Sequence, residues 1–96
     1  MKLVLSLRAV VRLREIRSYI AYDDAVAAAR VIERIRQSIE MLTDHPRLGR
    51  PWGDGRTRAL TVSGLPYRIH YRLVEAEERI EVITVAHVAQ RPPRLD

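Results

Sequence analysis

The chain has no cysteine and only three histidines, which limits the chemistry that its 96 residues can support. Without cysteine there is no disulfide framework and no thiol chemistry, and a metal site would have to consist of histidine and carboxylate side chains. No histidine, aspartate and glutamate cluster has metal-ligand spacing in the sequence. We therefore predict neither a metal nor another cofactor.

Long apolar runs are also absent. No stretch approaches the ~20 apolar residues that a membrane-spanning helix needs. Lys2 is followed by only three apolar residues, Leu3–Leu5, before polar residues return, which is too short for the apolar region of a signal peptide. We therefore expect a cytoplasmic protein that makes no membrane contact.

Lysine is nearly absent, since the seventeen basic residues are sixteen arginines and Lys2. An excess of arginine over lysine is typical of GC-rich genomes, so the informative quantity is the net charge of +5. A positive net charge favours an anionic partner, which can be nucleic acid, an acidic protein or both. The length and the 47% hydrophobic content predict one globular domain over residues 1–96.

The first half of the chain has the pattern of a short strand followed by two helices. Residues 2–7 alternate as a strand does, and Ser6 can cap a following helix. Apolar residues recur at spacings of three and four from Ala9 to Ile20, and again from Ala28 to Leu42. Between them Tyr22-Asp23-Asp24 breaks the pattern and supplies a new N-cap. The sequence thus predicts a helical hairpin.

After Pro46 comes a loop rich in glycine and proline, and then the apolar period changes from about 3.6 to 2. We predict strands at Thr57–Val62, Tyr67–Val74 and Ile80–Ala86, with the acidic residues 75–78 in the turn before the last strand. The element order β-α-α-β-β-β predicts an α+β fold, in which an antiparallel sheet packs on the N-terminal helical hairpin. The other face of the sheet is expected to be partly open and basic.

Four segments in this order resemble the ParE branch of the ParE/RelE superfamily, the toxins of bacterial toxin–antitoxin pairs. They are the loop His45–Pro51 (HPRLGRP), the strand start Thr57–Leu60 (TRAL), the strand Pro66–Arg72 (PYRIHYR) and the terminal segment Ile80–Pro93, which contains a histidine and basic residues. No single segment is specific, so the resemblance rests on their order. It spans nearly the whole chain and implies the RelE/ParE-like fold that the pattern also predicts.

The resemblance implies one of two activities. ParE-like members inhibit DNA gyrase by trapping it on cleaved DNA, whereas RelE-like members cleave mRNA on the ribosome. Cleavage by attack of a 2′-hydroxyl needs a base, a cation and an acid. Arg58, Arg68 and His87 are the candidates for such a nuclease site, but no carboxylate stands where the nuclease relatives carry their base.

The chain also ends in Arg91-Pro92-Pro93-Arg94 instead of a catalytic tyrosine segment. We therefore interpret it as a gyrase inhibitor without catalytic residues. The alternative is an enzyme, a RelE-like ribosome-dependent mRNA endoribonuclease. A third possibility is a regulatory member that only binds its antitoxin.

Several basic side chains of the second half are candidates for binding the target or another anion. They are Arg58, Arg68, His70, Arg72, His87 and Arg91. Arg58 and Arg68 would clamp a phosphate if both faced outward from adjacent strands, and otherwise they belong to a solvated basic face. His70 is more simply a solvated strand residue, and His87 a hydrogen-bonded structural histidine. Trp52 is either a contact anchor or a plug beneath the loop.

The resemblance further implies a cognate ParD-like antitoxin whose disordered C-terminal segment folds on the toxin. An acidic, amphipathic peptide would match the charge of +5. The expected contacts are the basic face of the sheet and the exposed side of the two helices, with Arg12, Arg17, Tyr19, Arg30 and Arg34. In this family operator DNA is bound through the antitoxin, so the charge of the toxin alone does not imply direct DNA contact.

Overall fold

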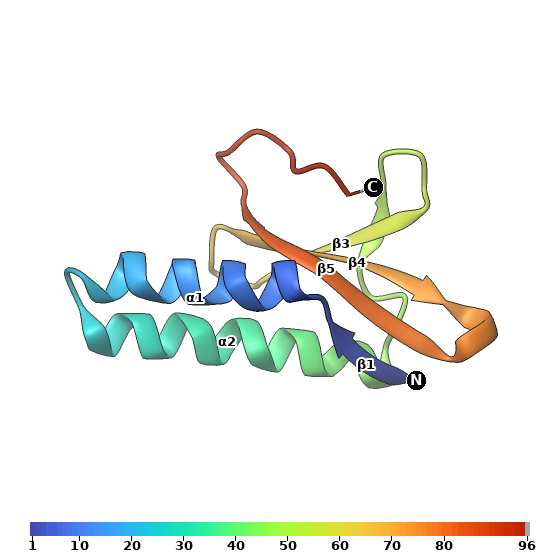
Figure 1. Cartoon of the computed structure of the whole chain (residues 1–96), viewed down its shortest axis with the longest axis horizontal. Coiled ribbons are helices and arrows are strands. Elements are labelled where there is room, and N and C mark those ends of the chain that lie inside the picture. Colours follow the sequence, from blue (N-terminus) through green and yellow to red (C-terminus); the bar gives the residue numbers. More distant parts are fainter. Residues whose placement is uncertain (96) are drawn as a thin grey trace.

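The computed structural model describes residues 1–95 and has the element order that the sequence predicts, with one additional short strand (Figure 1). The elements are β1 (Lys2–Leu5), α1 (Leu7–Ala21), α2 (Ala25–Asp44), β2 (Arg50–Trp52), β3 (Thr57–Thr61), β4 (Tyr67–Val74) and β5 (Arg79–His87). A 3-10 turn, Glu75–Glu77, joins the last two strands. No helix in the described residues is long and apolar enough to cross a membrane.

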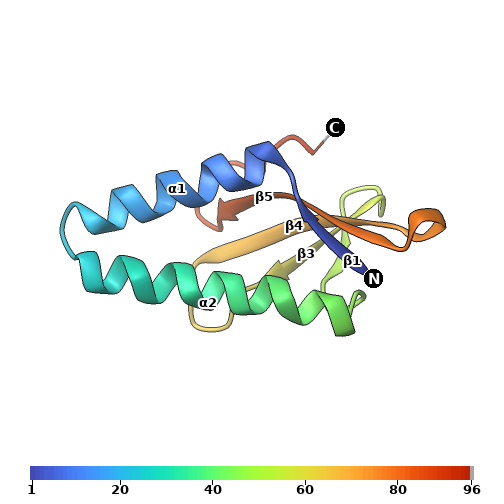
Figure 2. The same ribbon diagram turned by 60° about the horizontal axis from the view of Figure 1, so that its bottom comes forward.

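The two helices lie side by side as one layer and cover one face of the sheet, as Figure 2 shows. α1 packs against β5, and α2 packs against β1 and β5. The turn between the helices projects past the sheet and gives the molecule its long dimension of 43 Å, against 26 and 24 Å in the other directions. The opposite face of the sheet carries no helix, and we call it the open face.

Both helices begin where the sequence predicts. The backbone N–H of Ala9 donates to the Ser6 hydroxyl at 3.1 Å, and that of Ala27 donates to the Asp24 carboxylate at 3.0 Å. These bonds satisfy N–H groups that the first helical turn leaves without a partner. α2 ends at Asp44, just before Pro46, which cannot continue a helix.

The predicted fold class is confirmed, with two corrections inside the sheet. Its strand order is β1-β5-β4-β3-β2, and β1 runs parallel to β5, so the sheet is mixed instead of wholly antiparallel. The sequence could not predict this parallel pairing. The two strands are far apart in the chain, and the alternation of side chains does not show in which direction a strand runs. The short strand β2 lies within the loop predicted after Pro46 and pairs with β3. With three residues and a central Pro51, it is an edge strand that periodicity could not detect.

The phenol ring of Tyr71 is completely buried and joins the loop after α2 to the sheet. Its hydroxyl donates to the Pro46 carbonyl at 2.8 Å and accepts from the Gly49 N–H at 2.9 Å. A Cβ at Gly49 would lie 2.7 Å from the Tyr71 ring, so only glycine fits there. Arg58 donates to the Gly49 carbonyl at 2.7 Å. The HPRLGRP and PYRIHYR segments are therefore linked by direct contact.

We predict that Tyr71→Phe lowers the free energy of unfolding by about 1–3 kcal/mol, because it leaves the Pro46 carbonyl and the Gly49 N–H without their partner. Urea denaturation followed by circular dichroism measures the change. Tyr22→Phe is the matched control, since the Tyr22 side chain is 90% exposed, and it should change stability little. Equal effects of the two substitutions would contradict a structural role for the Tyr71 hydroxyl.

Candidate functional site

A groove runs along α1, between the helix and the C-terminal segment of residues 88–95. It consists of two hollows of about 480 and 450 Å³ that share Arg12, Glu15 and Gln90, and we call it the α1 groove. Its lining comprises Leu7, Arg8, Val11, Arg12, Glu15, Ile16 and Tyr19 of α1, Tyr67 of β4, Thr84–His87 of β5, and Ala89, Gln90, Arg91 and Pro93 of the C-terminal segment.

The apolar part of the α1 groove comes from a second stripe of α1. Ala9 and Ile16 face the core, whereas Leu7, Val11 and Tyr19 are 79%, 44% and 82% exposed. Their spacings of four and eight residues place them on one side of the helix. Apolar side chains that gather on a surface in this way are typical of protein interfaces. The sequence analysis named Arg12 and Tyr19 but missed Leu7 and Val11, although their spacing was available as a signal.

The C-terminal segment forms the other wall of the groove and is tied to the helix at two points. An Arg8 guanidinium N–H donates to the carbonyl of Arg94, and Arg12 donates to the side-chain oxygen of Gln90 at 3.2 Å. The N–H of Val88 also donates to the Pro66 carbonyl at 2.9 Å, which fixes the start of the segment. The groove is thus built from the two ends of the chain.

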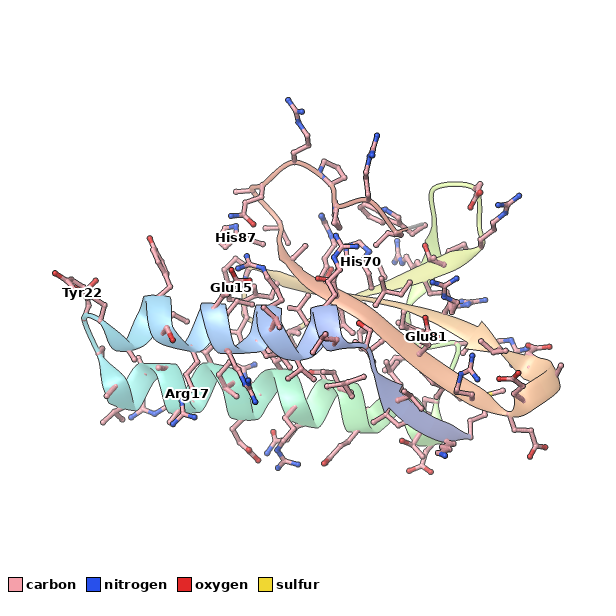
Figure 3. All side chains as sticks on the ribbon, viewed as in Figure 1. Glu15, Arg17, Tyr22, His70, Glu81 and His87 are labelled. Atoms are coloured by element: carbon pink, nitrogen blue, oxygen red, sulfur yellow. The ribbon has the colours of Figure 1, made fainter. Side chains whose placement is uncertain are left out.

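His87 lies at the end of β5, where the sequence predicts it, and it lines the α1 groove. Its Nδ1 accepts a hydrogen bond from the Ala89 N–H at 3.1 Å, so in the neutral ring the proton is on Nε2. The ring stands edge-on against that of Tyr67, with the centroids 5.4 Å apart. Figure 3 shows Glu15 beside His87 on this side of the helix. These contacts support the structural interpretation of His87.

The five residues predicted to contact an antitoxin do not share one surface. Arg12 and Tyr19 line the α1 groove. Arg17 is exposed on the opposite side of α1 from Glu15 (Figure 3). Arg30 is exposed on α2, and Arg34 donates to the Ser63 carbonyl in the turn between β3 and β4.

On the open face, the expectation that His70 is a solvated strand residue is wrong. Its side chain is 1% exposed and its Nδ1 has no hydrogen-bond partner among residues 1–95. Burial, and to a lesser extent the nearby guanidinium groups of Arg68 and Arg8, together lower the pKa of His70 to about 4. His70 is therefore neutral near pH 7 and cannot serve as a cation for an anionic ligand. The Trp52 ring, 5.1 Å away between centroids, helps to bury it.

Arg58 and Arg68 cannot clamp one phosphate, because they lie on opposite faces of the sheet. Arg58 is opposite Tyr71 in the pairing of β3 with β4, and so shares the helix-covered face. Arg68 is three residues before Tyr71 in the same strand and therefore faces the other way. His87 is opposite Tyr67, roughly 13 Å along β4 from Tyr71. The three residues proposed for a nuclease thus do not converge.

The other predicted anion-binding residues are divided between two surfaces. Arg72 lies on the open face and is paired with Glu81, with 3.2 Å between its Nε and the carboxylate. Arg79 approaches the other carboxylate oxygen of Glu81 at 3.5 Å. Arg91 is exposed and lines the α1 groove. Within residues 1–95 no three histidine, aspartate or glutamate side chains gather as metal ligands would.

Comparison with known proteins identifies a family. Residues 3–92 match the family model described as the ParE toxin of the type II toxin–antitoxin system parDE. The Sinorhizobium fredii protein named "Putative toxin Y4kP" is 41% identical over 90 residues, which cover 94% of this chain and 91% of the relative.

Three solved structures share the fold. A chain of the chromosomal ParDE system of Pseudomonas aeruginosa superposes with a TM-score of 0.79 at 21% identity, over 92% of this chain and 96% of that one. The Escherichia coli RelE toxin superposes with a TM-score of 0.71 at 16% identity, over 94% of this chain and 86% of that one. A YoeB/ParE toxin of Agrobacterium tumefaciens superposes with a TM-score of 0.59 at 24% identity, over 91% of this chain and 98% of that one. At these identities the likeness concerns the fold alone.

We predict that His70 makes stability fall in acid. Its pKa is about 4 in the folded chain against an ordinary 6.5, so the folded chain binds fewer protons than the unfolded chain between these values. This contribution is complete above pH 6.5 and declines as the pH falls from 6.5 to 4, by about 3 kcal/mol, since one unit of pKa difference corresponds to about 1.4 kcal/mol. The measurement compares the unfolding free energies of the protein and of His70→Leu at pH 7, 5.5 and 4. The advantage of the unsubstituted protein should shrink with acid, and a difference that is independent of pH would contradict the assignment.

Proposed function

We propose that this chain, which belongs to the ParE toxin family of type II toxin–antitoxin systems, inhibits DNA gyrase in the cytoplasm and is neutralised by a cognate ParD-like antitoxin. The observation that carries the proposal is the contrast between its surfaces. Arg58, Arg68 and His87 are directed to separate places, whereas the α1 groove is an open binding surface. A gyrase inhibitor needs binding surfaces and no converged catalytic set. The gyrase target itself is what the ParE resemblance implies.

The α1 groove suits an acidic, amphipathic segment of an antitoxin. Leu7, Val11 and Tyr19 supply apolar contact area, and Arg8, Arg12 and Arg91 line the same groove with positive charge. The groove-lining part of α1 spans about 18 Å, from 1.5 Å per residue, which accommodates a few turns of a helix or a short extended segment. A disordered segment that folds on such a surface combines apolar burial with electrostatic complementarity.

The enzymatic alternative remains a RelE-like endoribonuclease, because the fold is shared with the Escherichia coli RelE toxin. Glu15 lies beside His87 in the α1 groove, but Arg68 is on the open face, the other side of the sheet from His87, so these three side chains do not form one set. The catalytic reading is therefore the weaker of the two.

The proposed target can be tested directly. We expect the purified protein to abolish supercoiling by gyrase and to accumulate cleaved DNA, and a co-encoded antitoxin to reverse both effects. The measurement is a gel assay of supercoiling and cleavage with purified gyrase. No effect at a large excess of the protein, together with antitoxin-reversible cleavage of mRNA on ribosomes, would replace gyrase inhibition by the nuclease alternative.

The proposed docking of the antitoxin in the α1 groove can be tested by substitution. Val11→Glu and Arg12→Glu should each weaken antitoxin binding at least tenfold, because the first puts a charge among apolar contacts and the second reverses a charge in the groove. Isothermal titration calorimetry with the co-encoded antitoxin measures the loss.

The matched control is Arg17→Glu, which makes the same charge reversal on the far side of α1. It should leave the affinity nearly unchanged, and circular dichroism should show that all three variants are folded. If Arg17→Glu weakens binding as much as Arg12→Glu does, the antitoxin docks on the outer surface of the helices instead of the groove.

A further inference from the structure

A small hollow lies on the helix-covered side of the sheet, beyond the end of α2. It has a volume of about 200 Å³, and its lining comprises Arg47, Gly55, Arg56, Arg58, Leu73 and Glu75. Arg58 is opposite Tyr71 in the pairing of β3 with β4, and Leu73 follows Tyr71 by two residues, so both are on the side of the helices. We call it the Arg58 hollow. The sheet separates it from the open face, and it shares no lining residue with the α1 groove.

The three arginines of the hollow come from three segments. Arg47 lies in the loop after α2, Arg56 in the turn between β2 and β3, and Arg58 within β3. Arg58 is half-buried and is held by the loop, because its Nη1 donates to the Gly49 carbonyl at 2.7 Å and to the Arg47 carbonyl at 3.4 Å. Both bonds use one nitrogen, so the N–H groups of Nε and Nη2 remain for another partner. We predicted Arg68 as the partner of Arg58 in anion binding, whereas the arginines that share its hollow are Arg47 and Arg56.

The positive charge of the hollow is only partly compensated. Arg58 has no carboxylate within 4 Å among residues 1–95. Arg47 is paired with Glu75, and the Nε of Arg56 lies 3.3 Å from the Asp54 carboxylate. The side chains of both pairs are more than half exposed, and ion pairs of this kind are weak enough to be exchanged for another anion. Because three arginines and one glutamate line the hollow, it has an excess of two positive charges.

This excess and the direction of the arginines from three segments suit a tetrahedral dianion. A phosphoryl group carries nearly two negative charges near neutral pH and offers three acceptor oxygens, which several guanidinium groups can share. A carboxylate carries one charge, and a single arginine already satisfies both of its oxygens. Among residues 1–95 the lining includes no histidine and no hydroxyl side chain, so we expect binding without hydrolysis.

We propose that the Arg58 hollow is a binding site for a dianionic phosphoryl group, which pairs with the guanidinium groups of Arg47, Arg56 and Arg58. Inorganic phosphate and a small phosphate monoester share this chemistry, and the titration below distinguishes them. The volume is more than about ten times that which one ordered water needs, so a small substituent fits beside Leu73. The site depends neither on gyrase being the target nor on an antitoxin in the α1 groove.

The site can be tested by a titration that reports position as well as affinity. Nitrogen-15-labelled protein at pH 7.5 in 50 mM salt is titrated with inorganic phosphate and with glycerol 3-phosphate while its backbone amide signals are followed by NMR. We expect saturable shifts at Gly55, Arg56 and Arg58, with a dissociation constant on the order of 1 mM. The ligand with the lower dissociation constant identifies the preferred form. Dimethyl phosphate and acetate, which carry one negative charge each, should bind several-fold more weakly at the same ionic strength.

One pair of variants separates the arginines of the hollow from the net charge. Arg56→Gln should weaken phosphate binding about fivefold or more, because it removes one guanidinium group from the lining. The control Arg14→Gln removes one exposed positive charge from α1 and should leave the affinity nearly unchanged.

A second pair changes the charge in the opposite direction. Glu75→Gln should strengthen phosphate binding about threefold or more, since among residues 1–95 it removes the only carboxylate of the lining and releases Arg47. The control Glu33→Gln makes the same change of charge and releases Arg36 on α2, and it should have little effect.

All four substituted side chains are exposed, so the variants should be folded, which circular dichroism checks. The proposal is overturned if neither phosphate nor glycerol 3-phosphate produces saturable shifts at Gly55, Arg56 and Arg58, or if acetate binds equally well. It is also overturned if Glu33→Gln strengthens binding as much as Glu75→Gln does, since binding would then follow net charge alone.

Discussion

The contact of Tyr71 with the loop after α2 holds the helical and sheet parts of the fold in one arrangement. The buried hydroxyl satisfies the Pro46 carbonyl and the Gly49 N–H, and burial raises the pKa of Tyr71, so its proton stays available for the hydrogen bond. Because β2 begins at Arg50, directly after Gly49, this contact also sets where β2 joins the sheet. The position of Trp52 on the open face therefore depends on a side chain in another strand.

The sheet separates two kinds of surface. Its helix-covered face is mostly apolar and includes deeply buried residues of β4 and β5, such as Ile69, Tyr71 and Val82. On its open face Arg72 and Arg79 share the carboxylate of Glu81, and Arg79 also pairs with Glu77. The alternation of side chains along a strand thus places the arginines on the open face. Whether their charge is paired with a carboxylate depends on which residues lie opposite them on neighbouring strands.

The C-terminal segment extends from the α1 groove to the open face of the sheet. Arg91 and Pro93 line the α1 groove, while Leu95 lies near Arg72 and Thr57 of the open face. The same short segment therefore lines the α1 groove and reaches the open face. The exposed apolar side chains of α1 (Leu7, Val11 and Tyr19) differ in chemistry from the open face, where Arg68 lies over the ring of Trp52.

Local patterns predicted most of the fold but less of the site. The caps at Ser6 and Asp24 and the bounds of β4 follow from residue type and spacing, since helix caps and strand alternation are local properties. Strand β2 escaped prediction because three residues are too few to show a period. For the site, the alternation of β4 placed Arg68, His70 and Arg72 correctly on one face, but it carried no information on what would cover them.

The sequence by itself determined the element order, the α+β class, the positive charge and the family, because these depend on composition and on the order of segments along the chain. Only the tertiary structure decided that His70 is buried and neutral, that Arg58 and Arg68 point to opposite faces, and that the two chain ends form a groove. The physical reason is that exposure, cross-strand register and charge compensation are set by residues distant in sequence. The chemistry of a side chain follows from its residue type, but the groups that surround it are brought together by the fold.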